Sequence, residues 1–150
     1  MNLGTVEEIL DYAIASEENA ASFYTELANR ASQEHMKEVF LSFAEEEKGH
    51  KAKLLQAKAG KQMLAARERV LDLRIGDHLE DVDLSGDLDY QQALIVAMKA
   101  EKNAFRMYQG LASATDDPRL KAMLLGLAQE EAKHKLRFEI EYDDNVLKEN

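Results

Sequence analysis

Apolar side chains recur along this chain in alternating steps of three and four residues. The pattern runs through four long segments, at residues 5–30, 32–58, 89–113 and 117–143. Such steps keep side chains on one face of an α-helix. Helix breakers are few, with one proline and seven glycines, while the good helix formers Ala, Glu, Lys, Leu and Gln are plentiful. The sequence therefore predicts an all-α protein with four long amphipathic helices.

Capping residues mark the ends of the predicted helices. The first and third helices open with the capping-box sequences TVEE at Thr5 and DYQQ at Asp89. The fourth opens at Asp117, which suits the N-cap, followed by Pro118 in the first helical position. The second helix, which follows Ser32, should stop before Gly60, and a frayed tail should follow the fourth.

A long connection, residues 61–88, separates the second helix from the third. Its first part, KQMLAARERVLDL, can form a short helix, and GDHLEDVDLSGDLD reads as an acidic loop. The other two connections are short and predict antiparallel hairpins. A connection as long as the central one is typical of a crossover along a four-helix bundle.

The two predicted hairpins are copies of each other. Matching residues lie 84 positions apart without a gap, over segments of about 5–58 and 89–142. The matched pairs include Leu10 and Leu94, Glu17 and Glu101, Asn19 and Asn103, Tyr24 and Tyr108, Ala28 and Ala112, Glu47 and Glu131, and His50 and His134. This internal duplication predicts a single domain over residues 1–150, in which the hairpins pack about a pseudo-twofold axis.

Each predicted helix carries one carboxylate in the middle of its apolar stripe, and two helices add a histidine one turn later. The carboxylates are Glu17, Glu47, Glu101 and Glu131, and the histidines are His50 and His134. Burying an isolated ionised carboxylate costs several kcal/mol, so four of them need protonation, cationic partners or metal ions. No Lys or Arg recurs on the stripes at this level. Two divalent ions would balance the four charges, and this ligand set is typical of di-iron and di-manganese carboxylate bundles.

Each element of this pattern is weak evidence for a metal site by itself, because a single Glu-x-x-His on a charged helix usually lies on a solvent-exposed face. The repetition on two apolar stripes carries the metal hypothesis. Tyr24 and Tyr108 lie on the same stripes and are predicted to hydrogen-bond a ligating carboxylate across the bundle, unless they are core tyrosines satisfied elsewhere. Asn19 and Asn103 are either groups that contact the ligands or surface residues, and the surface interpretation is favoured. His35 and His78 have no partner in the repeat and are predicted to be exposed.

Composition excludes several other classes of function. The chain has no cysteine, which excludes disulfides, thiolate metal sites and a cysteine nucleophile, and fits a reducing compartment. A net charge of -10 argues against nucleic acid as a partner. The longest apolar run, residues 93–98, is far shorter than the roughly 20 residues that span a bilayer, so no membrane partner is expected. The N-terminus lacks the pattern of a secretory signal.

The segments EENAASFYTELA with FAEEEKGH, and EKNAFRMYQGLA with LAQEEAKH, resemble the rubrerythrin family of ferritin-like di-iron proteins. The resemblance extends over about residues 10–138 and implies a ferritin-like four-helix bundle with two iron ions per chain, although manganese or zinc also suits the ligands. It further implies reduction of hydrogen peroxide or dioxygen, a cytoplasmic location and a homodimer. By the resemblance, Glu47 and Glu131 would bridge the metals, Glu17 and Glu101 would be terminal carboxylates, and His50 and His134 would be terminal nitrogen ligands.

Two departures from the family pattern bear on activity. Rubrerythrins proper carry a rubredoxin domain with four cysteines, whereas this sequence has none, so the reductant should be a separate electron-donor protein. Rubrerythrins proper also have an extra Glu one turn after the third-helix ligand, where this chain has Ala104, and Ala20 occupies the matching place in the first helix. The site therefore resembles a symmetric, bacterioferritin-like centre, which weakens the case for an efficient peroxidase.

Three functions remain open from the sequence. The first is a di-iron oxidoreductase that protects against oxidative stress by reducing peroxide or dioxygen with electrons from an external donor. The alternative is a ferroxidase or iron-handling protein that binds, oxidises and passes on or stores iron. The third is a structural bundle with a vestigial site. The sequence favours the first two, because both halves retain their ligands.

Overall fold

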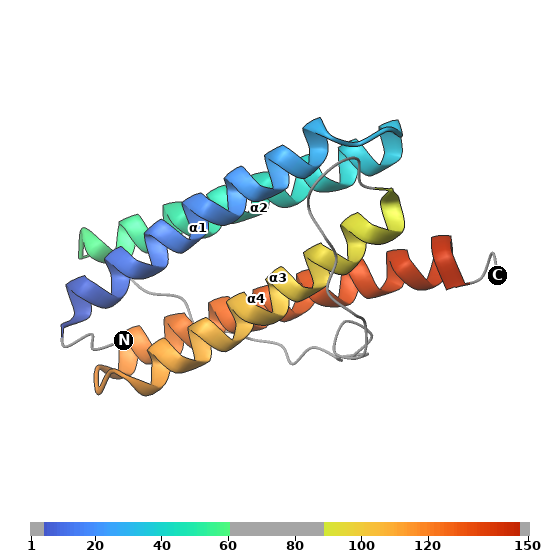
Figure 1. Ribbon diagram of the computed structural model, residues 1–150. Helices are drawn as coiled ribbons and strands as arrows, with labels where there is room; N and C mark the ends of the chain where they lie inside the picture. Colours follow the sequence, from blue (N-terminus) through green and yellow to red (C-terminus); the bar gives the residue numbers. More distant parts are fainter. Residues whose placement is uncertain (1–4, 61–88, 148–150) are drawn as a thin grey trace.

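Four long helices form an antiparallel bundle in the computed structural model of the chain, which describes residues 5–60 and 89–147 (Figure 1). The helices are α1 (Val6–Asn29), α2 (Glu34–Lys58), α3 (Tyr90–Ser113) and α4 (Pro118–Tyr142). Across these described residues there is no strand, so the predicted all-α class is confirmed. No helix among them is long and apolar enough to cross a membrane.

The helices pair as two hairpins, α1 with α2 and α3 with α4. Packing is close within each hairpin, whereas the two hairpins lie further apart. In Figure 1, α2 ends at the end of the bundle opposite to the one where α3 begins. These positions of the two helix ends are the ones that a crossover connection requires. The predicted short helix and acidic loop at residues 61–88, with His78, lie outside the described residues.

Side-chain caps fix the start of three helices. Thr5 Oγ1 accepts a hydrogen bond from the Glu8 backbone N–H at 3.1 Å, and its hydroxyl donates to the Glu8 carboxylate at 3.0 Å. At Asp89 both backbone bonds of a capping box are present. Asp117 accepts from two backbone N–H groups at the start of α4, and Pro118 occupies the first turn. These three predicted helix starts are confirmed.

The other predicted ends need small corrections. The N-cap of α2 is Gln33, one residue after the predicted Ser32, and it makes no side-chain cap bond. Gly60 follows α2 with a φ of 84°, a left-handed conformation that suits glycine and ends the helix as predicted. The tail after α4 is not frayed throughout, because Asp143–Leu147 continue as a π-helical turn.

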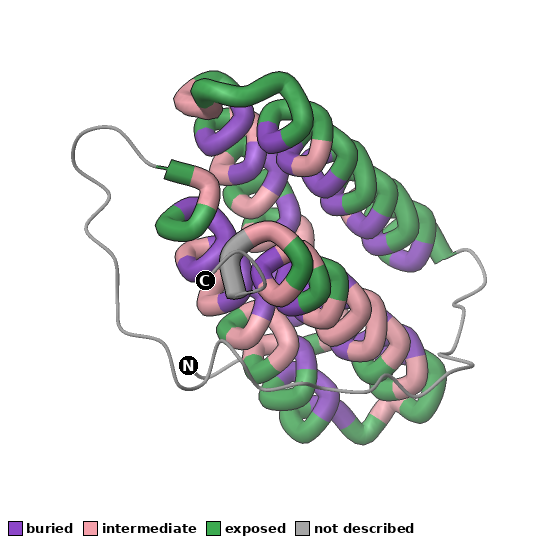
Figure 2. The backbone as a smooth tube through the Cα atoms, turned by 90° about the vertical axis from the view of Figure 1, so that its right-hand side faces the viewer, coloured by how far each residue is buried: buried purple, intermediate pink, exposed green. Residues whose placement is uncertain are grey.

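The core consists of two apolar clusters, one toward each end of the bundle, with a polar layer between them. Figure 2 shows the buried positions as a stripe on the inner side of each helix. One cluster is rich in aromatic rings and centres on Tyr24, Phe40, Phe43 and Phe138. The other is mainly aliphatic and includes Leu10, Leu54, Leu120 and Leu124. The residues predicted to lie on the apolar stripes of α2 and α4 are all buried, namely Met36, Phe40, Phe43, Glu47, His50 and Leu54, and Leu120, Leu124, Leu127, Glu131, His134 and Phe138. Ile14 on the stripe of α1 and Phe105 on that of α3 are only half-buried.

Candidate metal centre

The six predicted ligands meet in the polar layer between the two apolar clusters. Each helix supplies one glutamate, and α2 and α4 each add a histidine three residues later, because i and i+3 share a helix face. All six are buried, with at most 4% of their surface exposed. The structure therefore brings together every side chain that the sequence selected, namely Glu17, Glu47, His50, Glu101, Glu131 and His134.

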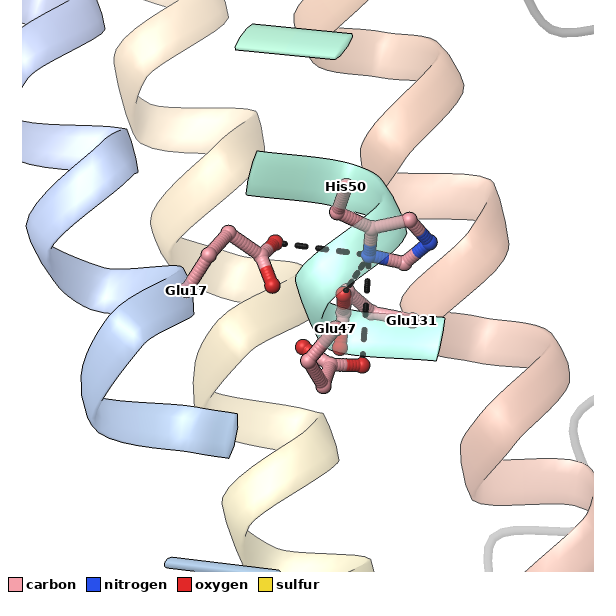
Figure 3. A group of neighbouring side chains, drawn as sticks. All are labelled: Glu17, Glu47, His50 and Glu131. Atoms are coloured by element: carbon pink, nitrogen blue, oxygen red, sulfur yellow. Dashed lines mark hydrogen bonds and ion pairs between the residues drawn. The ribbon is translucent and has the colours of Figure 1, made fainter. Parts of the chain in front are cut away.

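These side chains form two overlapping groups. Figure 3 shows the first group, which has Glu17 from α1, Glu47 and His50 from α2, and Glu131 from α4. The second group has Glu47, Glu101, Glu131 and His134. Within each group, one potential ligand atom per residue lies within 4.8 Å of all the others. Glu47 and Glu131 belong to both groups, as two carboxylates shared by neighbouring metal ions would.

The distances around the two histidines repeat almost identically, as the sequence duplication predicts. His50 Nδ1 lies 2.9 Å from Glu131 Oε1, and His134 Nδ1 lies 2.8 Å from Glu47 Oε1. Each Nδ1 is also 3.4 Å from the α1 or α3 carboxylate of its own hairpin. Each lies 3.9 Å from the glutamate of its own Glu-x-x-His pair. The duplication in the sequence is thus matched by nearly equal distances in the two halves of the site.

Two buried tyrosines hold the α1 and α3 carboxylates from the opposite hairpin. The Tyr24 hydroxyl donates to Glu101 Oε1, and the Tyr108 hydroxyl donates to Glu17 Oε1. Both phenols are at most 1% exposed. The predicted hydrogen bonds across the bundle are therefore present, and each links one hairpin to the other.

The donor atoms of the site fit metal ions better than they fit one another. Among the described residues, four buried side-chain atoms make no directed hydrogen bond, namely Glu17 Oε2, Glu47 Oε1, Glu101 Oε2 and His134 Nδ1. Glu47 Oε1 and His134 Nδ1 form an ion pair at 2.8 Å, which leaves Glu17 Oε2 and Glu101 Oε2 as the two unpaired oxygens. Leaving such an atom unpaired costs about 1–3 kcal/mol, so native structures rarely tolerate several in one place. Carboxylate oxygen and imidazole nitrogen are donors that iron, manganese and zinc accept. The residues present therefore suit two divalent ions.

The electrostatics of the side chains lead to the same conclusion. Burial, reinforced by Glu131 and opposed by His134, raises the pKa of Glu47 to about 9. Burial and neighbouring carboxylates also raise the pKa of Glu131. Burial disfavours the His50 imidazolium, but Glu131 and Glu17 outweigh this and raise its pKa to about 10. The pKa of His134 is raised by the same kind of contacts. In the metal-free protein, protons on these four groups offset the negative charge of the buried carboxylates. Two divalent ions would offset the same charge when bound.

Removing either tyrosine hydroxyl should destabilise the protein by a similar amount. Tyr24→Phe and Tyr108→Phe each leave a buried carboxylate without its donor, so the free energy of unfolding should fall by about 1–3 kcal/mol. Urea unfolding measures the change. Tyr12→Phe is the control, because Tyr12 is 42% exposed and should change stability by less than about 0.5 kcal/mol. Equal stability of the Tyr24 and Tyr12 variants would show that the buried hydrogen bond contributes nothing.

One contact at the site was not predicted. The Glu46 side chain, which is 43% exposed, places Oε2 3.0 Å from His134 Nε2. In the sequence Glu46 is one of three consecutive glutamates, and nothing local distinguishes it. Asn19 and Asn103 are exposed as predicted. His35 is also exposed, and its Nε2 lies 3.1 Å from a Glu141 oxygen.

Comparison with known proteins agrees with this geometry. The profile of the Rubrerythrin family matches residues 8–74, which include three of the six clustered residues. A solved structure of a hypothetical protein from Pyrococcus furiosus is 31% identical to this chain, with a TM-score of 0.65, and the match covers 93% of this chain and 89% of that one. No curated protein matches the chain. With the family profile on the first hairpin, its ligand pattern repeated in the second, and a structural relative along most of its length, the chain belongs to the rubrerythrin family.

Proposed function

We propose that this protein is a di-iron carboxylate oxidoreductase that reduces hydrogen peroxide or dioxygen with electrons from an external donor protein. The observation that supports this most strongly is the pair of overlapping ligand groups that share Glu47 and Glu131. A shared pair of carboxylates holds two ions close together. Two adjacent iron ions, when bound, supply two electrons together, which is what cleavage of an O–O bond requires.

In this proposal Glu47 and Glu131 would bridge the two ions, and each of the other four ligands would bind one ion. Glu17 and His50 would bind one ion. Glu101 and His134 would bind the other. Tyr108 and its counterpart Tyr24 each donate to one oxygen of a terminal carboxylate and keep it in place, and the other oxygen has no hydrogen-bond partner. The apolar clusters above and below the layer limit access of water to it.

Iron is proposed on the basis of the family, because carboxylate and imidazole also accept manganese and zinc. The identity of the ion decides the chemistry, since zinc has no redox activity. The cytoplasmic location, the homodimer and the separate electron donor stay predictions from the same family resemblance.

A second candidate is a ferroxidase or iron-handling protein, and one observation favours it. Ala104 of α3 and Ala20 of α1 are both half-buried methyl side chains at the places where an extra carboxylate would lie. Neither can ligate a metal ion, so the six-residue site stays symmetric. A symmetric site without an additional ligand suits iron that enters, is oxidised and leaves.

Rapid mixing of the anaerobic iron(II) protein with hydrogen peroxide and, separately, with dioxygen distinguishes these functions. The oxidoreductase predicts faster oxidation by peroxide, two irons retained per chain and repeated turnover with a reductant. The iron-handling alternative predicts a preference for dioxygen, with iron released or further iron consumed. A protein that binds iron but reacts with neither oxidant would contradict both, and would leave the bundle with a structural role.

A further inference from the structure

The two histidines of the site differ in what lies behind them, although their contacts with the central carboxylates are the same. His134 Nε2, the ring nitrogen turned away from those carboxylates, lies 3.0 Å from Glu46 Oε2. Glu46 is in turn held by Arg137, whose Nη1 donates to its two oxygens at 3.1 and 3.2 Å. The Arg137 guanidinium carbon lies 4.5 Å from the centre of the Phe43 ring. The Phe43 and His134 rings pack edge to face, with their centres 4.8 Å apart. His134 is therefore held from behind by a charged pair and an aromatic ring.

The duplicated half lacks this arrangement. At the offset of 84, Arg137 corresponds to Lys53 and Phe43 to Leu127. Glu46 corresponds to Glu130, so the carboxylate is retained, but Glu130 pairs with Lys133 at 3.5 Å. In the described ranges 5–60 and 89–147, no hydrogen bond or ion pair joins Glu130 or Lys53 to His50, whose ion pairs are with Glu17, Glu47 and Glu131. Figure 3 shows His50 with Nδ1 toward the carboxylates and its other nitrogen turned away from them.

A carboxylate behind a ligating imidazole has a known chemical effect. When Nε2–H donates to Glu46, the remaining ring proton is fixed on Nε2 and the Nδ1 lone pair is directed at the metal. The negative charge behind the ring also makes Nδ1 a better donor to a cation. Arg137 and Phe43 restrict Glu46 and the ring, so less motion is lost when an ion binds. None of these effects acts on His50 through the described residues.

We propose that Glu46 is a positioning residue for the metal position that contains His134. This position fills first and holds its ion more tightly, whereas the position that contains His50 is the weaker and more exchangeable one. The inference rests on the proposed di-metal site and assigns an order of filling within it. It also names the position from which an iron-handling protein would release its ion.

Stepwise titration of the metal-free protein with Co²⁺, followed by calorimetry and visible absorption, tests this order. We expect the wild-type protein to bind two ions in two resolved steps. Glu46→Gln keeps the size of the side chain but removes its charge, and it should weaken the first step by about 10- to 100-fold with the second unchanged. Glu130→Gln is the matched control from the duplicated half and should leave both steps unchanged. Because the Glu46 and Glu130 side chains are 43% and 38% exposed, both variants should fold, which circular dichroism checks.

The histidine variants give an independent readout. His50→Ala should retain the tight step and lose the weak one, whereas His134→Ala should lose the tight step. The assignment of Glu46 would be wrong if the Glu46→Gln protein bound two ions with the same isotherm as the wild type. It would also be wrong if Glu46→Gln and Glu130→Gln weakened metal binding equally. Either result would leave the di-metal site intact. Failure of the wild-type protein to bind Co²⁺ would overturn the proposed metal site as well.

Discussion

Loading with two iron(II) ions should raise the midpoint of thermal unfolding by about 10–20 °C. An ion that binds only the folded state, at a hundredfold excess over its Kd, adds about 2.7 kcal/mol, so two ions add about 5 kcal/mol. For a chain of this size, each kcal/mol shifts the midpoint by about 2–4 °C. The physical source of the gain is the layer of four buried carboxylates, whose charges and unpaired oxygens the ions satisfy. Anaerobic calorimetry of the metal-free and iron-loaded protein measures the shift.

Glu47→Gln should abolish that rise while leaving the metal-free protein nearly as stable as before. Because burial raises the pKa of Glu47 to about 9, this side chain is protonated at neutral pH without metal, and Gln closely matches the protonated form. The amide lacks the negative charge with which Glu47 would bridge two ions. Glu45→Gln is the control: Glu45 is 73% exposed, so this variant should keep the full rise. A full rise in the Glu47 variant would show that this carboxylate does not bind the ions.

Stability should fall with rising pH in the metal-free protein, whereas the stabilisation by metal should increase. The pKa of Glu47 rises from 4.5 to about 9 on folding, and that of His50 from 6.5 to about 10. Between the unfolded and folded pKa values the folded state binds more protons, so its stability is greatest at low pH and falls as the pH rises. Each excess proton contributes a slope of about 1.4 kcal/mol per pH unit. We therefore expect metal-free protein to lose stability between pH 6.5 and 9, where both groups contribute.

Metal binding should offset this trend, because ions compete with the same protons. Filling the site should release about two to four protons per chain near neutral pH, from the two imidazoles and the two shared carboxylates. The metal affinity, and with it the stabilisation by metal, should therefore increase as the pH rises. Calorimetric titration in two buffers of different ionisation enthalpy counts the protons. Binding without proton release, or metal-free stability that increases through this pH range, would show that the carboxylates and imidazoles are not protonated as described.

The helices and the residues of the site were predictable because they depend on local spacing. An apolar stripe interrupted by Glu47 and His50 at the level where other helices carry Glu17 and Glu101 requires these groups to meet once the helices pack. The constant offset between the halves supplied the second group. Tyr24 was predictable for the same reason, since it shares the stripe and its duplicate behaves identically.

The contact of Glu46 and the difference between the two halves behind their histidines were not predictable from one helix at a time. Glu46 reaches His134 only because α2 and α4 come together, and the acidic run around it conceals its role. The differences between the halves, such as Arg137 in one and Lys53 in the other, were visible in the sequence. Their role could not be inferred without the contact between Arg137 and Glu46. Lys135 and Glu139 are also buried, with Nζ and Oε2 3.5 Å apart, although two charged residues on a helix predict an exposed face.

The most direct test of the di-metal centre is a crystal structure of the anaerobic iron(II) protein, with anomalous scattering recorded at the iron edge. We expect two iron peaks between Glu47 and Glu131, one bound by His50 Nδ1 and Glu17, the other by His134 Nδ1 and Glu101. A single peak, peaks on the surface of the bundle, or an iron-free centre that keeps its side chains hydrogen-bonded to one another would contradict it.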